Sequence, residues 1–524
     1  MKEFNTTGIC VSHMHYMVDI SGKISDIRKL IDKGHYFTIN RGRQYGKTTT
    51  LYEICERLSG EYLVIKISFE GLGDESFSSS EHFCAVFLDL VVDALENPAV
   101  SFEQEIIQGW QSSDITSFHL LARHISKNCR GRKVVLLIDE VDRISNNQVF
   151  LNFLGMLRRK FLATRAGRDI TFHSVILAGV YDIKNIKLKL VNEGSHLPTA
   201  TEGKILNSPW NIAVNFLVDM SFSPVEISSM LNDYETDKCT GMDITKVAKS
   251  IHSYTSGYPF LVSRICQIID EGEDKEWTEA GISNAVTALI TETNTLFDDI
   301  IKNIRNHEKL NELMYNTLFL GKNESFNLDR EAVNLGHMFA FISNVNGIVK
   351  VSNKIFESRI YAYYVSNAES EENANKDIGI AMQEVLAGGG LNMELLLRNF
   401  AIHYREIFSN RDVNFLERHG RLLFLTYLKP FINGNGFYYT ETEIGDFRLD
   451  VVINYKNEQY IVELKVWRGE KYEKMAHAQL ENYLKLKNAD KGYLLTFDFR
   501  KETSGKQPEQ WIKIGDKDVF SVLV

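Results

Sequence analysis

Between residue 22 and about residue 218, short continuous apolar runs alternate with stretches of helical periodicity, and this alternation limits the possible folds more than any other feature. Strands are predicted at residues 36–40, 62–69, 134–138 and 171–178. Helices are predicted between them, at residues 48–58, 81–95, 117–128 and 149–161. Uninterrupted apolar strands are covered on both faces, and strands separated by helices pair in parallel. The pattern therefore predicts a parallel α/β sheet.

The rest of the chain has different patterns. Residues 223–300 are helical in periodicity throughout. Residues 310–365 predict two helices and then a strand pair around Asn346-Gly347, which is compatible with a winged helix-turn-helix. The polar stretch 366–376 and the glycines at 388–390 are linker candidates. After opening helices, the block from residue 393 to residue 524 predicts strands at 436–442, 446–455, 459–466 and 491–497 and a helix at 475–487.

A phosphate-binding loop is predicted where the first strand meets the next helix, at residues 41–48 with the sequence RGRQYGKT. Backbone N–H groups and the helix dipole at such a junction favour bound phosphate. Gly46 would let the backbone approach closely, Lys47 would reach the β- and γ-phosphates, and the Thr48 hydroxyl would ligate Mg²⁺. Arg41 occupies the position where the usual motif has its first glycine, which is a departure from the pattern.

A second motif supports this prediction. Residues 134–140, with the sequence VVLLIDE, form an apolar strand that ends in two acids. Asp139 is placed to hold Mg²⁺ through water, and Glu140 is placed to polarise the attacking water. In open α/β sheets, ligands bind at this end of the strands. The alternative is a buried strand that simply reaches solvent at two acids, and the upstream Gly-Lys-Thr argues against it.

Together with Ser256-Gly257-Tyr258-Pro259, these motifs resemble those of bacterial AAA-ATPase-like proteins, close to the archaeal-ATPase and STAND-type P-loop NTPases, over roughly residues 8–300. Relatives often carry arginine in place of the first loop glycine, and Arg41 or Arg43 would then contact phosphate. The G-x-P motif is typical of the family's lid. The resemblance implies an ATP and Mg²⁺ site that comprises Arg41, Arg43, Gly46, Lys47, Thr48, Thr49 and Asp139, with Glu140 as the catalytic base.

Two features of that family are less clear in this chain. A polar sensor residue is expected near the end of the fourth strand, where Tyr181 or Asp182 is the nearest candidate. An arginine finger from a neighbouring subunit would come from Arg158 or Arg159, which would make the protein a homo-oligomer. The alternative for this pair is a solvated helix face, the usual fate of a charge run.

A second constellation of charged residues lies near the C-terminus. Asp450 begins the run DVVI, and Glu463 and Lys465 lie in IVELK on the following strand segment. The two-residue period of a strand puts Glu463 and Lys465 on one face. Buried charges are costly unless they are paired or bind a metal, and two carboxylates suit Mg²⁺ or Mn²⁺. Lys465 would orient water or neutralise developing charge.

This pattern resembles the PD-(D/E)XK nuclease superfamily. Gln479 and Tyr483 match the Q-x-x-x-Y motif of several branches, and Glu417 matches an additional helical acid. The resemblance implies Asp450, Glu463 and Glu417 as metal ligands and Lys465 as a catalytic residue. Relatives commonly have G-R-G-R-x-D before the strand, and Asp446 replaces the earlier arginine here. The alternatives are an exposed hairpin with an ion pair, or a folded domain that has lost activity.

The predicted architecture is α/β, with five segments: a P-loop ATPase core at 1–220, a helical lid at 221–305, a winged-helix-like segment at 306–366, a linker at 367–392, and a restriction-endonuclease-like α/β domain at 393–524. The expected function is Mg²⁺-dependent cleavage of DNA under nucleotide control. The alternative is an ATP-switched DNA-binding or signalling module with an inactive nuclease-like domain. The net charge of −10 argues against a generally basic surface, yet a local basic groove remains compatible with it.

The expected location is the cytoplasm, without a membrane partner. The N-terminal residues lack the basic and apolar regions of a signal peptide, and the apolar runs are shorter than a membrane span. The six cysteines are scattered and form no C-x-x-C pair, which indicates reduced thiols.

Overall fold

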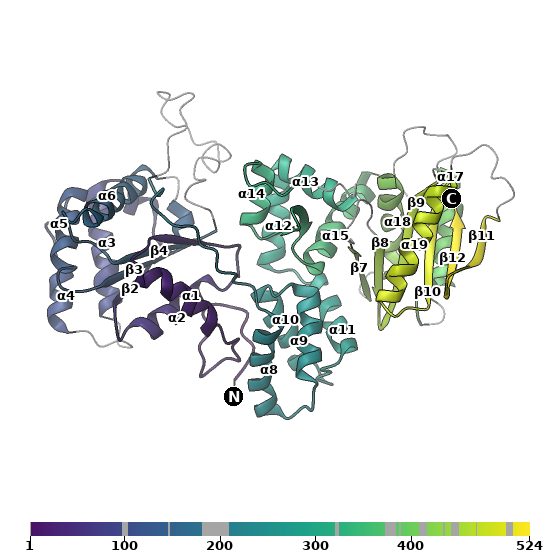
Figure 1. Cartoon of the computed structure of the whole chain (residues 1–524), viewed down its shortest axis with the longest axis horizontal. Helices are drawn as coiled ribbons and strands as arrows, with labels where there is room; N and C mark the ends of the chain where they lie inside the picture. The colour runs from purple at the N-terminus through teal and green to yellow at the C-terminus, as the bar shows by residue number, and fades with distance from the viewer. Residues whose placement is uncertain are drawn as a thin grey trace, which may run out of the picture. The chain divides into compact units, whose positions relative to one another are not determined.

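The protein is described by a computed structural model that covers residues 2–96, 103–144, 147–180, 209–319, 324–371, 384–386, 389–407, 417–432, 435–441, 450–467, 469–498 and 507–524. The chain forms two compact units (Figure 1). The first comprises Met1–Phe222 together with Tyr258–Phe260, and the second comprises Ser223–Gly257 and Leu261–Val524.

The first unit is built on a four-stranded parallel sheet. Its strands are β1 (Phe37–Asn40), β2 (Leu63–Ser68), β3 (Val134–Asp139) and β4 (Ser174–Gly179), in the order β1-β4-β3-β2. Every residue of β3 and β4 is buried, which is why both strands are continuous apolar runs in the sequence. The predicted parallel α/β sheet is confirmed.

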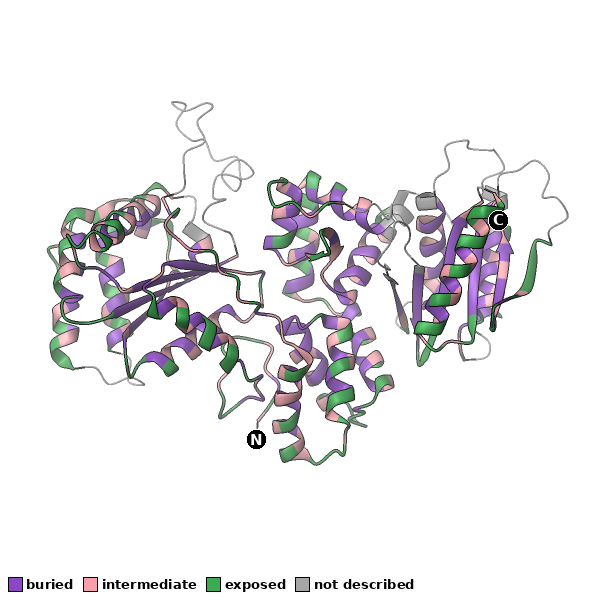
Figure 2. Ribbon diagram, viewed as in Figure 1, coloured by how far each residue is buried: buried purple, intermediate pink, exposed green. Residues whose placement is uncertain are grey.

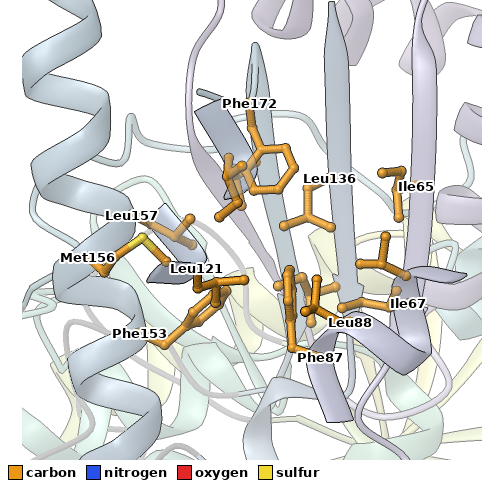
Figure 3. Close-up of a cluster of buried hydrophobic side chains, with 14 of the residues drawn as sticks. Ile65, Ile67, Phe87, Leu88, Leu121, Leu136, Phe153, Met156, Leu157 and Phe172 are labelled. Carbon is orange, nitrogen blue, oxygen red and sulfur yellow. The ribbon is translucent and has the colours of Figure 1, made fainter. Parts of the chain in front are cut away.

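Helices pack around this sheet. They are α1 (Ser21–Asp32), α2 (Lys47–Leu58), α3 (Ser80–Leu95), α4 (Gln104–Trp110), α5 (Phe118–Asn128) and α6 (Gln148–Arg165). One large core contains side chains from α3, α5 and α6 packed on β2 and β3; Figure 3 shows Phe87, Leu121, Phe153 and Leu136 among them. Serine residues cap α3 and α5, which fixes where each helix begins.

The second unit begins with a helical bundle. Its helices are α8 (Pro224–Lys238), α9 (Ile244–Thr255), α10 (Pro259–Glu271) and α11 (Glu279–Thr291). Ser223 and Glu226 form a capping box at the start of α8, and proline occupies its first position. The helical pattern predicted for this part of the chain is confirmed.

A small helical segment with a β-hairpin follows. It contains α12 (Thr295–Asn306), α13 (Glu308–Phe319), α14 (Glu331–Met338), the hairpin of β5 (Ile342–Val345) and β6 (Ile348–Val351), and α15 (Lys354–Glu371). Asn346 and Gly347 connect the strands with φ values of 54° and 82°, as a two-residue hairpin turn requires. The first residues of the predicted linker are in fact helical, because α15 runs to Glu371.

The C-terminal part is a six-stranded mixed sheet with helices on both faces. The strands β7 (Gly436–Glu441), β8 (Asp450–Tyr455), β9 (Glu458–Val466), β10 (Lys491–Phe497), β11 (Glu509–Ile514) and β12 (Lys517–Leu523) are ordered β11-β12-β10-β9-β8-β7. The helices are α17 (Met393–Ile407), α18 (Glu417–Ile432) and α19 (Glu470–Leu486). Strands β11 and β12 were not predicted, and α19 begins five residues before the predicted start at residue 475.

Two glycines show which helix covers which face of this sheet. A Cβ on Gly420 of α18 would lie 2.4 Å from the ring of Phe497, and a Cβ on Gly492 would lie 2.8 Å from Leu484 of α19. Positions 492 and 497 on β10 belong to opposite faces because side chains alternate along a strand. Helices α18 and α19 therefore lie on opposite faces, and the strands between them are largely buried (Figure 2).

Among the described residues, no helix combines the length and the apolar character needed to cross a membrane.

Candidate functional sites

The loop after β1, where a phosphate-binding loop is predicted, ends in a glycine at the start of α2. Gly46 is the N-cap of α2 and has a φ of 75°, in the left-handed region that glycine adopts at little cost. Lys47 is only 8% exposed. Its ammonium donates to the carbonyl oxygens of Arg41 and Gly42, each at 2.9 Å. The lysine therefore lies folded over the loop, with its charge held by backbone carbonyls.

The other predicted loop residues have different surroundings. The Arg41 guanidinium donates to the carbonyl of Val218 at 3.0 Å and lies 5.6 Å from the ring centroid of Phe216. Arg43 is exposed and Thr48 is half-buried. The Thr49 hydroxyl accepts a hydrogen bond from the backbone N–H of Cys10 at 3.3 Å. Arg41 and Thr49 thus hold neighbouring segments in place, which leaves Arg43 as the more accessible arginine.

The predicted acids lie at the same edge of the sheet as this loop. Asp139 ends β3 and is buried, and its carboxylate accepts from the backbone N–H of Glu140 at 3.0 Å. Glu140 has a φ of 55°, a conformation that turns the chain sharply away from the strand. Strand β4 lies between β1 and β3, and its Gly179 carbonyl accepts from the N–H of Arg41 at 3.1 Å. The loop and the acids therefore meet around the end of β4.

Asp142 is a residue of this site that the sequence prediction missed. Its carboxylate accepts a hydrogen bond from the backbone N–H of Val180, just after β4, at 2.5 Å. A Cβ on Gly179 would lie 2.7 Å from the same carboxylate, so the close approach depends on glycine. The motif LLIDEVD contains this third acid, and its place next to Asp139 and Glu140 was the available signal.

The pKa values of Lys47 and Glu140 are shifted by burial and by the charges near them. Burial lowers the pKa of Lys47, while Asp142, Glu140 and Asp139 act in the other direction and favour its charged form. Burial raises the pKa of Glu140, Lys47 lowers it, and the two aspartates raise it. A carboxylate with a raised pKa is a stronger base, which is the property a water-activating group needs.

The C-terminal charged pair lies on the central strand β9. Glu463 is 0% exposed and Lys465 is mostly buried, and their side chains form an ion pair. Both belong to the face of the sheet that α19 covers, because β9 pairs Glu463 with Leu494 and Lys465 with Thr496 of β10. Val462 and Leu464 fill the opposite face, as predicted. Two charges inside a sheet are costly to bury, which makes this pair a candidate for a chemical role.

The register of β8 and β9 bears directly on Asp450. Val451 pairs with Val462 and Val452 with Ile461, so the same antiparallel register places position 450 opposite position 463. Positions directly opposite one another belong to the same face of a sheet. The backbone therefore brings the two predicted acidic positions together, although they are thirteen residues apart in the chain. The side chain of Asp450 lies outside the described residues.

The remaining predicted residues of this site are on helices. Gln479 and the buried Tyr483 lie on α19, which packs against β9 and β10 on the Glu463 face. Glu417 begins α18, on the other face, and its side chain is outside the described residues. Its role as a metal ligand stays a prediction. Within the described part of the chain, no group of three His, Cys, Asp or Glu side chains is close enough to hold a metal.

Two predictions about the first unit, the sensor residue and the arginine finger, are not tested by the described residues. The sensor candidates at positions 181 and 182 lie outside the described residues. On α6, Arg158 is half-buried and Arg159 is exposed, and their role as an arginine finger stays a prediction.

Comparisons with known proteins agree with this architecture. The family described as AAA-like domain matches residues 12–363, and the PD-(D/E)XK nuclease superfamily matches residues 436–507. No curated protein matches the sequence.

Several solved structures are similar in part. The Walker-type ATPase of Pyrococcus abyssi has a TM-score of 0.44 and 9% identity, over 67% of this chain and 98% of that one. The ORC2 protein of Aeropyrum pernix, in ADPNP and ADP complexes, has a TM-score of 0.37 and 11% identity, over 70% and 98%. Drosophila ORC bound to DNA has a TM-score of 0.28 and 13% identity, over 60% and 79%. At these TM-scores the likeness is too weak to indicate function.

The resemblance suggested by the sequence motifs is thus confirmed by the two family matches, and the chain belongs to the AAA-like domain family, with a PD-(D/E)XK nuclease superfamily domain at its C-terminal end.

Proposed function

We propose that this protein binds and hydrolyses ATP in its first unit and cleaves DNA phosphodiester bonds in its C-terminal domain, with the nucleotide controlling cleavage. The main support for cleavage is the buried pair of Glu463 and Lys465 on a face where the register also places position 450. The main support for ATP hydrolysis is the meeting of the Lys47 loop with Asp139 and Glu140 around the end of β4.

At the ATP site, each residue has a distinct task. Lys47 would exchange its bonds to the Arg41 and Gly42 carbonyls for the β- and γ-phosphates, while the N–H groups at the start of α2 bind the same phosphates. Thr48 and Asp139 would hold Mg²⁺. Glu140 would accept a proton from the attacking water, and its raised pKa suits it to that task.

At the nuclease site, the donor set fits a divalent cation. A carboxylate on β9, opposite a second acidic position on β8, supplies the hard oxygen ligands that Mg²⁺ and Mn²⁺ prefer. When bound, such an ion lowers the pKa of water and stabilises charge on the phosphate. Glu463 and Asp450 would hold it. Lys465 would orient the attacking water and offset the negative charge that develops, and Gln479 and Tyr483 would support this arrangement from α19.

Nucleic acid, in particular DNA, is the proposed partner. With a net charge of −10, attraction for a polyanion has to be local. Lys471 and Lys474 are exposed in the first turns of α19, the helix on the Glu463 face. They would contact the phosphate backbone beside the cleavage site.

The test incubates the full-length protein with supercoiled plasmid and, separately, with single-stranded DNA. Each substrate is combined with Mg²⁺, Mn²⁺ or EDTA, and with or without ATP. We expect nicking or cutting that needs the metal and changes with ATP. DNA that is shifted in a gel but remains intact would instead support the ATP-switched DNA-binding module. A phosphate-release assay on the same preparation measures ATP hydrolysis separately.

A further inference from the structure

Tyr258 belongs to the first unit, although most of its neighbours in the sequence belong to the second. The residues before and after Tyr258–Phe260 belong to the second unit, yet these three pack with the first. The Tyr258 side chain is 2% exposed. Its hydroxyl donates a hydrogen bond to the carbonyl oxygen of Arg43, and its ring meets the ring of Tyr45 edge-on, with centroids 4.7 Å apart. Tyr258 therefore contacts the middle of the phosphate-binding loop.

The point of contact matters because the loop there is in a costly conformation. Gln44, the residue after Arg43, has a φ of 54°, and Gly46 has a φ of 75°. A side-chain-bearing residue in the left-handed region is unfavourable unless its surroundings hold it. Tyr258 bonds the carbonyl immediately before Gln44 and packs on Tyr45 immediately after it. We infer that Tyr258 helps to hold the loop in the conformation that presents N–H groups to phosphate.

The turn that joins Tyr258 to α9 is tightly bonded. Ser256 ends the helix with a φ of 47°, and its N–H bonds the carbonyl of His252 at 2.8 Å. The buried Thr255 hydroxyl donates to the carbonyl of Ile251 at 2.9 Å and accepts from the N–H of Gly257 at 3.1 Å. Pro259 then begins α10. Tyr258 thus follows directly on a turn whose backbone is bonded to the end of α9.

The last turn of α9 contacts the sheet that contains the nuclease residues. The ring of Tyr254 lies 6.0 Å from that of Phe437 on β7. The Lys354 ammonium lies 5.6 Å from the Tyr254 ring centroid and 4.5 Å from that of Tyr439, also on β7. Strand β7 pairs with β8 along its length, up to Glu441 opposite Asp450. The last turn of α9 is therefore adjacent to the strand pair on which a proposed metal ligand lies.

We propose that Tyr258 is a positioning residue of the ATP site and that Tyr254, one turn earlier, transmits the state of the phosphate-binding loop to the β7 edge of the nuclease sheet. This inference rests on the proposed function, since it assigns the route by which nucleotide controls cleavage. A route of contacts shows adjacency, whereas coupling is a measured free energy. The experiment therefore measures both ends of the route.

The first variant is Tyr258→Phe, which keeps the ring and removes the hydroxyl. Because one buried hydrogen bond to the loop is lost, the KM for ATP is expected to rise about 3- to 10-fold, with kcat changed by less than about twofold. Tyr234→Phe is the matched control. It also removes a tyrosine hydroxyl bond, that to Asp270 at 2.7 Å, but within the helical bundle. Its KM is expected to equal that of the wild type.

The second variant is Tyr254→Leu, which removes the ring between Lys354 and Phe437 and leaves Tyr258 in place. The KM and kcat for ATP hydrolysis are expected to stay unchanged. The cleavage rate with ATP, divided by the rate without ATP, is expected to become about one. Cleavage without nucleotide should persist, which shows that the nuclease sheet is folded.

The possible outcomes distinguish a failure of the proposed function from a failure of the roles assigned to Tyr258 and Tyr254. A wild-type protein that neither binds nor hydrolyses ATP contradicts the proposed function and this inference with it. An active wild type with an unchanged KM in Tyr258→Phe overturns only the positioning role. A Tyr254→Leu protein whose cleavage still responds fully to ATP overturns the transmission, as does a wild type whose cleavage ignores ATP.

Discussion

Asp142 accepts a hydrogen bond from the backbone N–H of Val180 at 2.5 Å and thereby ties the chain after β3 to the chain after β4. Strand β4 lies between β1, which leads into the predicted phosphate-binding loop, and β3, which ends at the acids. The bond therefore holds together the segments that follow β3 and β4, at the edge of the sheet where ATP is proposed to bind. Burial lowers the pKa of Lys47, and Asp142, with Glu140 and Asp139, opposes that shift by favouring the charged form. A residue outside the usual pair of acids thus supports both halves of the site.

Removal of this carboxylate is expected to weaken ATP binding. Asp142→Ala loses the charged acceptor of the hydrogen bond from the Val180 N–H, and we expect the Kd for ATP to rise about tenfold. Asp142→Asn keeps a hydrogen-bond acceptor, so its Kd for ATP should rise less. Gly179→Ala leaves Asp142 in place but puts a methyl group 2.7 Å from its carboxylate, so it should resemble Asp142→Ala. Titration with a fluorescent ATP analogue measures all three, and equal affinities throughout would contradict the role.

Lys47→Ala is expected to abolish ATP binding because it removes the ammonium that is proposed to bind the β- and γ-phosphates. The measurement is isothermal calorimetry with ATP and Mg²⁺, accompanied by thermal unfolding, since the variant also loses two hydrogen bonds to loop carbonyls. An intact unfolding transition with no heat of binding is the expected pair of results. Binding within about twofold of the wild type would exclude the proposed site.

Glu463→Ala and Lys465→Ala are expected to abolish DNA cleavage and leave ATP turnover intact, because the charged pair belongs to the second unit. Loss of one partner from a buried pair destabilises by about 3–5 kcal/mol, so an inactive variant needs a folding control. Thermal unfolding of each variant serves that purpose, and Glu463→Gln is the mildest change because it keeps the shape of the side chain and removes only the charge. Gel assays of plasmid cleavage and phosphate release report the two activities, and cleavage by Glu463→Gln at the wild-type rate would remove the nuclease assignment.

A buried ion pair in the first unit, between Lys160 and Asp169, is expected to contribute to stability independently of either proposed activity. Lys160 on α6 is 2% exposed and donates to Asp169 at 2.8 Å and to Ser126 at 2.6 Å. Asp169→Ala leaves this ammonium buried without its counter-charge and should destabilise the first unit by about 2–3 kcal/mol. Lys160→Met should cost less, because Asp169 is partly exposed and keeps its bond from Ser126 at 2.7 Å.

Urea unfolding of these variants measures the difference. The double variant Lys160→Met with Asp169→Ala should be more stable than Asp169→Ala alone, since it removes the uncompensated charge. The reverse order of stability would show that the pair is not buried as described.

The strands of the first unit could be predicted because each is an apolar run that needs no partner to be recognised. The continuous stretch 134–138 requires burial on both faces wherever it lies. The glycine before α2 could also be predicted, because Gly46 has the positive φ that glycine adopts most easily, whereas the phosphate-binding role of this loop stays a prediction. The last two strands were missed, and β11 shows why: it leaves most of its residues exposed, so its sequence lacks a strong apolar signal.

The sequence by itself singled out the candidate residues: a lysine after the first strand, two acids at the end of the third strand, and a Glu-x-Lys on a later strand. Only the tertiary structure decided which of them meet. Position 450 faces position 463 because of the register between β8 and β9, and Asp142 reaches Val180 because β4 lies beside β3. Tyr258 reaches Arg43 across 215 residues of chain. Such contacts depend on pairing between distant segments, which local periodicity does not encode.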